Sequence, residues 1–243
     1  MLRMQDVLSA PPKGTDLSEL RGVSLYPADS QRAGQLVVAN SHKSGSSVLR
    51  YSANVTKTAG HRDFIDAMLV MDKQDPALIH PYSLLFATLN FHLTPRRLFV
   101  ACQDSSSVLA YDADTGTPMP VGSHWQATYP HATFDAGTLV PSMSAVGYAG
   151  GGLASPRSMA IDLRRNQLFV VDSAGDCVRG YDVSTGEFLG DVWCGTDSSN
   201  RDKGKYPIGL VLMHDSRHVV WPARYFKPLA LRVILTLISA LWF

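Results

Sequence analysis

The sequence predicts an all-β protein, and three observations support this fold class. The apolar runs are short and rich in β-branched and aromatic residues, as at residues 168–171. Clusters of Asp, Ser, Asn and Gly, which favour turns, separate these runs, as at residues 172–176. One pattern of runs and turns recurs along the chain. Short strands that alternate with turns favour antiparallel sheets.

The most complete copy of this pattern spans residues 155–188 and reads SPRSMAIDLRRNQLFVVDSAGDCVRGYDVSTGEF. We expect four strands, at residues 158–162, 168–171, 177–182 and 187–193. The second of them contains no polar residue, which is typical of a strand that is covered on both faces. The copy therefore predicts one four-stranded sheet.

Three further segments repeat the positions of this copy. Leu98, Val108 and Tyr111 have the same spacing as Leu168, Val178 and Tyr181, ten residues and then three, and Pro81 corresponds to Pro156. An earlier segment aligns Pro27, Leu36, Val48 and Tyr51, and a later one places Val219 twelve residues after Pro207. Since one such sheet cannot cover its own two faces, the copies must stack around an axis as the blades of a β-propeller. An ordinary β-sandwich with similar turns is the alternative.

The repeated pattern resembles the NHL repeat and its relatives among six-bladed and YVTN-type propellers. The resemblance covers about residues 25–221, and residues 155–188 carry its most specific part. It implies an upper face built from the loops that enter each first strand and the loops between the second and third strands. On this basis the predicted binding residues are His80, Gln103, Asp104, Arg157, Asp172, Asp176 and Lys205, with Lys43 nearby. Propellers of this kind bind protein or RNA, and some relatives are enzymes, but no catalytic residue of those enzymes can be matched to this sequence.

The predicted organisation has three parts. Residues 1–24 form a lead-in, residues 25–226 form the incomplete propeller with about four recognisable blades, and residues 227–243 form an apolar tail. A long insertion at about residues 117–154 interrupts the repeats. Its Trp125, Tyr129 and His131 are candidates for a binding loop, because long loops on a rigid scaffold often carry function. Alternatively, part of the insertion supplies the missing fourth strand of its blade and the rest is disordered.

The composition limits the classes of partner and cofactor. A formal net charge of +1 disfavours nucleic acid, which would require clustered Lys and Arg. The spacings of Cys102, Cys177 and Cys194 match no zinc motif, and we expect all three to be reduced core residues in a cytoplasmic protein. The N-terminus has no apolar core typical of a signal peptide. We expect no metal and no other cofactor.

Two features allow a structural and a functional interpretation. Asp162, Asp172 and Asp182 recur at ten-residue steps, and we expect them to close turns rather than to bind calcium or act in catalysis. The apolar segment 229–243 would span about 22 Å as a helix, less than the ~30 Å hydrocarbon core of a membrane. A truncated gene model, a buried terminal element and a membrane anchor are all consistent with it.

The sequence therefore predicts a non-catalytic propeller that acts as a protein-interaction or scaffold module through its loop face. One alternative is a lactonase-like hydrolase or lyase, with metal ligands that converge on the axis from separate blades. Another is a non-functional truncated fragment, since four incomplete blades leave sheet edges open.

Overall fold

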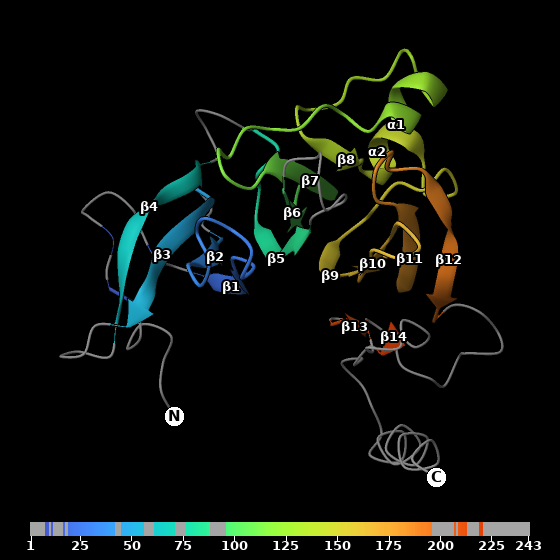
Figure 1. Ribbon diagram of the computed structural model, residues 1–243. Helices are drawn as coiled ribbons and strands as arrows, with labels where there is room; N and C mark the ends of the chain where they lie inside the picture. Colours follow the sequence, from blue (N-terminus) through green and yellow to red (C-terminus); the bar gives the residue numbers. More distant parts are fainter. Residues whose placement is uncertain are drawn as a thin grey trace, which may run out of the picture.

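The computed structural model describes residues 8–9, 11, 17, 19–41, 45–55, 61–70, 76–87, 96–195, 207, 209–212 and 219–220. These residues form three four-stranded antiparallel sheets and one two-stranded sheet, which lie side by side along an arc (Figure 1). Strands that are consecutive in the sequence are neighbours in each sheet. The prediction of an all-β, propeller-type architecture is confirmed.

Each four-stranded sheet is one blade. Blade 1 contains β1 (Leu20–Leu25), β2 (Leu36–Asn40), β3 (Ser47–Val55) and β4 (Arg62–Val70). Blade 2 contains β5 (Pro81–Ala87), β6 (Arg97–Cys102), β7 (Ser107–Asp112) and β8 (Thr138–Val140). Blade 3 contains β9 (Pro156–Asp162), β10 (Gln167–Asp172), β11 (Cys177–Asp182) and β12 (Phe188–Cys194). The two-stranded sheet contains β13 (Val211–Leu212) and β14 (Val219–Val220), and the helices are α1 (Ser123–Thr128) and α2 (Met143–Val146).

The strand register repeats at the positions that the sequence spacing indicated. The paired residues are Leu36 and Tyr51 in blade 1, Leu98 and Tyr111 in blade 2, and Leu168 and Tyr181 in blade 3. The two-stranded sheet continues the series, because its pair Leu212 and Val219 corresponds to Ile161 and Leu168. The fourth repeat thus begins with the same register as the third.

The first repeat begins earlier than the alignment on Pro27 suggested. Pro81 and Pro156 begin β5 and β9, where they pair with Cys102 and Asp172. In blade 1 the corresponding partner of Asn40 is Leu20, so β1 lies within the segment expected to be a lead-in. Pro27 lies in the turn after β1. The sequence pattern does not reveal this strand, because exposed and half-buried residues alternate along it and it forms no apolar run.

Apolar side chains fill the space between neighbouring blades. The central strands β2, β6 and β10 are almost entirely buried, as expected for strands covered on both faces. One cluster joins blades 1 and 2 and includes Val37, Val48, Leu84, Leu98 and Tyr111. Another joins blades 2 and 3 and includes Phe99, Val108, Met159, Leu168 and Tyr181.

An N-terminal segment covers the other face of blade 1. Leu8 and Leu17 pack in a cluster with Val38, Leu49 and Tyr51. The Ser9 N–H donates a hydrogen bond to the Arg62 carbonyl at 3.0 Å, and its hydroxyl accepts one from the Phe64 N–H at 2.7 Å. The segment therefore covers the apolar face of blade 1 that does not pack against blade 2.

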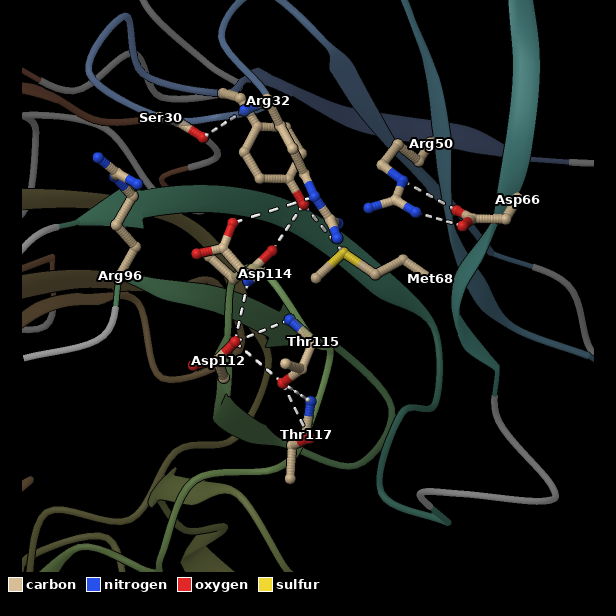
Figure 2. A network of polar contacts seen from close by, with 12 residues as sticks. Ser30, Arg32, Arg50, Asp66, Met68, Arg96, Asp112, Asp114, Thr115 and Thr117 are labelled. Atoms are coloured by element: carbon tan, nitrogen blue, oxygen red, sulfur yellow. Dashed lines mark hydrogen bonds and ion pairs between the residues drawn. The ribbon is translucent and has the colours of Figure 1, made fainter.

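Polar contacts hold blades 1 and 2 together at the end opposite to the starts of β1 and β5 (Figure 2). The Tyr26 hydroxyl donates to the Ala113 carbonyl at 2.6 Å, and the Tyr26 ring lies 4.5 Å from that of Phe86. Burial raises the pKa of Tyr26 to about 12. Arg32 and Asp114 form an ion pair across the same interface at 4.0 Å.

The insertion after β7 provides the outer strand of blade 2 in two pieces. Pro118 forms a bridge to Tyr111, and β8 then continues the pairing with β7. The Gly137 N–H donates to the Met119 carbonyl at 2.9 Å and closes the loop between the two pieces. The hypothesis that the insertion supplies the missing strand is thus confirmed.

Arg179 of β11 attaches the second half of the insertion to blade 3. Its side chain is only 1% exposed, and its guanidinium donates to the carbonyls of Tyr148 and Gly152 at 2.8 and 2.6 Å. Its Nε atom pairs with Asp191 at 2.8 Å. The rings of Tyr148 and Phe188 lie 4.1 and 4.3 Å from the guanidinium carbon. The buried Arg179 of β11 therefore links the insertion loop to the outer strand β12.

We expect the substitution Arg179→Ala to lower the free energy of unfolding by about 3 kcal/mol, because it removes the partner of Asp191 and leaves two carbonyls without a donor. Urea denaturation followed by tryptophan fluorescence measures the change. Arg164→Ala, at an exposed turn position of the same blade, is the matched control and should change stability by less than about 0.5 kcal/mol. Equal effects of the two variants would contradict the anchoring role.

Blades 1 and 2 approach closely at Gly22. A Cβ atom at this position would lie 2.7 Å from the Ser83 Cα atom and 2.8 Å from the Tyr82 carbonyl oxygen. We expect Gly22→Ala to destabilise the protein by about 1–3 kcal/mol, since the backbones of β1 and β5 must move apart. Gly45→Ala is the control, because a Cβ there meets no atom within 4 Å. Thermal unfolding of both variants tests this, and an unchanged midpoint for Gly22→Ala would refute the close approach.

Candidate binding face

The three blades build the same loop arrangement at one end, which we call the upper face. In each blade, the residue after the second strand donates a backbone hydrogen bond to the residue just before the first strand. The pairs are Ser41 to Glu19 at 2.9 Å, Gln103 to His80 at 3.0 Å and Ser173 to Ser155 at 2.9 Å. A backbone contact therefore holds the loops that the family resemblance assigned to binding in each of the three blades.

Three side chains meet at the upper ends of the innermost strands. Arg21, Tyr82 and Arg157 occupy the same position in β1, β5 and β9, directly after the first residue of each strand. The guanidinium carbons of Arg21 and Arg157 each lie 5.4 Å from the centre of the Tyr82 ring. Two cations from the neighbouring blades thus contact one aromatic ring. We call these three residues the axial patch.

His80 links the axial patch to the loops of the upper face. It has a positive φ of 54°, and its N–H donates to the Ser46 hydroxyl at 3.1 Å. The Nδ1 atom lies 3.0 Å from a carboxylate oxygen of Asp104, and Nε2 lies 3.7 Å from Glu19. Glu19 also accepts a hydrogen bond from Arg21 at 2.5 Å. The predicted residues His80 and Asp104 are therefore in contact, next to the axial patch.

Three buried polar atoms near the patch have no hydrogen-bond partner among the described residues. They are His80 Nε2, Ser83 Oγ and Arg157 Nε. The 3.7 Å separation of His80 Nε2 from Glu19 permits an ionic attraction but is too long for a hydrogen bond. Ser83 Oγ and Arg157 Nε can donate a hydrogen bond, whereas His80 Nε2 can do so only when both ring nitrogens carry a hydrogen, because Nδ1 already faces the Asp104 carboxylate.

The other predicted upper-face residues have different surroundings. Asp172 is buried, and its carboxylate accepts hydrogen bonds from the N–H groups of Ala154 and Ser155 at 2.9 and 2.7 Å, so it shapes the loop before β9. Asp176 is half-buried with a φ of 56°, and its carbonyl accepts from Gly195. Lys43 and Lys205 lie outside the described residues.

The insertion residues lie away from the upper face. The loop that carries α1 packs against the turn after β11, where the His124 N–H faces the Thr185 carbonyl at 3.4 Å. Trp125 is fully buried, and its indole N–H donates to the Leu139 carbonyl at 2.7 Å. Tyr129 is half-buried and lines a hollow of about 450 Å³ in this loop, and His131 is exposed. The structure does not bring Trp125, Tyr129 and His131 together with His80.

Two of the three recurring aspartates, Asp162 and Asp182, close turns as predicted, whereas Asp172 binds the loop before β9. Asp162 accepts a hydrogen bond from the Arg164 N–H at 3.0 Å, and Asp182 accepts from the N–H groups of Ser184 and Thr185 at 2.9 and 2.8 Å. Burial disfavours the charged form of Asp182, but hydrogen bonds from Thr185, Ser184 and Asn166 outweigh this and hold its pKa below the usual value.

The expectation of reduced cysteines is wrong for two of the three. Cys177 and Cys194 form a disulfide between directly paired positions of β11 and β12, whereas Cys102 is buried in the core. The pairing depends on the length of the turn between the strands, which the cysteine spacing does not reveal. Asp191 lies close to both sulfur atoms. In the described part of the chain, Cys177, Asp191 and Cys194 are the one set of side chains whose potential ligand atoms lie close enough together to hold a metal ion. The disulfide form offers no thiolates, so a metal does not fit there.

Comparisons with known proteins add little to this description. No protein-family model matches the chain, and no curated protein matches it. Among solved structures, a chain of the crystal structure of the nidogen/laminin complex matches with 15% sequence identity and a TM-score of 0.48. The alignment covers 84% of this chain and 56% of the matched chain, so this protein spans little more than half of the length of the matched chain. The propeller assignment therefore rests on the sheets themselves. Within the described residues, no helix is long and apolar enough to span a membrane.

The disulfide can be tested by counting thiols. Under denaturing conditions without reductant we expect one reactive thiol per chain, that of Cys102, and three after reduction. The double variant Cys177→Ser/Cys194→Ser should lose about 3 kcal/mol of stability, because the bond closes a chain segment with a sequence separation of 17. Three thiols in protein purified under oxidising conditions would show that the bond does not form.

Proposed function

We propose that the protein is a non-catalytic, NHL-like propeller module that binds another protein through its upper face. The observation that carries the proposal is the axial patch, where Arg21 and Arg157 contact the ring of Tyr82. Arginine and tyrosine are enriched among the residues that dominate binding energy at protein interfaces. The patch lies at the meeting point of three blades, which can surround a bound segment.

The rigidity of the upper face supports the same proposal. The backbone hydrogen bond between the loops recurs in all three blades, so little conformational entropy is lost when a partner binds. A cytoplasmic location stays a prediction. The Cys177–Cys194 disulfide weighs against it, because disulfides persist mainly in oxidising compartments.

Site-specific photo-crosslinking in the native cell tests the proposed face. A photoreactive residue at Ala174, exposed on the upper face of blade 3, should give cross-links to a protein that mass spectrometry identifies. The same residue at Leu163, exposed at the opposite end of blade 3, should not cross-link to that protein. An excess of the unlabelled chain should abolish the specific product. Cross-links of equal yield from both positions, or from neither, would refute binding through the upper face.

A further inference from the structure

We propose that the axial patch binds a single carboxylate, supplied by an Asp or Glu side chain of the partner. The inference rests on the proposed function and specifies the chemistry of the contact. It begins with Arg157, which lies over the Tyr82 ring and has no carboxylate within ion-pair distance among the described residues. Its Nε atom is buried and donates no hydrogen bond there. A buried charged donor without an acceptor is costly, so this position favours an anionic ligand.

The neighbouring groups favour the same ligand. His80 Nε2 and Ser83 Oγ are two further buried atoms without a hydrogen-bond partner in the described part of the chain. His80 lies two residues before Tyr82, and Ser83 lies directly after it, at the start of β5. Of these two atoms, the Ser83 hydroxyl can donate to a carboxylate, which has two oxygens and about four acceptor sites.

The position of the guanidinium group over an aromatic ring suits this role, because the cation–π contact leaves its N–H groups available for an acceptor. Arginine pairs with a carboxylate through two parallel hydrogen bonds. The contact with Tyr82 favours this position of Arg157 before the partner arrives, which lowers the entropic cost of binding.

The surrounding charges select a single carboxylate over a polyanion. Glu19 and Asp104 flank the patch through Arg21 and His80. Their negative charges repel an extended phosphate chain, which carries several charges, more strongly than they repel a single carboxylate next to Arg157. The formal net charge of +1 for the whole chain likewise gives no broad attraction for nucleic acid.

The test is an NMR titration of the ¹⁵N-labelled full chain with two peptides, Ac-Gly-Ser-Glu-Ser-Gly-NH₂ and its Gln counterpart. The Glu peptide should shift the Nε–H resonance of Arg157 and bind at least tenfold more tightly than the Gln peptide. Arg157→Gln should lower the affinity for the Glu peptide at least tenfold, Arg157→Lys should lower it less, and Arg164→Gln, in an exposed turn, should leave it unchanged. The unfolding midpoint of each variant shows whether it is folded.

Parallel titrations with inorganic phosphate and with a ten-residue oligothymidylate distinguish other anions. Tighter binding of either than of the Glu peptide would overturn the assignment to a protein carboxylate. Equal binding of the Glu and Gln peptides would also overturn it. If the Glu peptide does not bind but the cross-links from Ala174 persist, the carboxylate site is wrong and the proposed function stands. If the Glu peptide binds and Ala174 gives no cross-link, the proposed function fails while the anion site stands.

Discussion

The structure depends on the need of each sheet to bury two apolar faces. Val37, Val38 and Ala39 of β2 are fully buried in succession, so both sides of the strand contact other side chains. A single layer of four strands would leave both sides in water at a cost of roughly 25 cal/mol per Å² of apolar surface. Blades 2 and 3 satisfy this requirement by packing against each other, and blade 1 packs against blade 2 and the N-terminal segment. The arc in Figure 1 follows from that packing.

Irregular segments complete the packing where the blades alone do not fill the space. The insertion between β7 and β9 contributes Trp125, Val146 and Leu153 to the core between blades 2 and 3. Its backbone is hydrogen-bonded to blade 3 through Arg179 and through the Tyr181 hydroxyl, which donates to the Gly151 carbonyl at 2.8 Å. The loop that suggested a binding site by its aromatic residues is therefore in large part an element of the core.

The sequence allowed prediction of the strand positions that recur in each blade, but not of the contacts that occur only once. The Leu and Tyr positions of the central strands were found because a pair of buried residues in register must recur at a fixed spacing. Arg21 was missed because β1 carries no apolar run, and without β1 its equivalence to Tyr82 and Arg157 cannot be seen. The alignment of Pro81 with Pro156 makes Tyr82 equivalent to Arg157, but it does not show that arginines from the two neighbouring blades contact the Tyr82 ring. The cation contacts on the Tyr82 ring and the bond between Cys177 and Cys194 join side chains from different strands, and their proximity follows from the fold and not from local sequence.

The segment that carries Leu8 and Leu17 has a consequence for the shape of the whole assembly. In a closed propeller, the last blade packs against the face of the first blade that points away from the second blade. Here Leu8 and Leu17 already cover that face. A further blade could pack against this face only after Leu8 and Leu17 had left Val38, Leu49 and Tyr51.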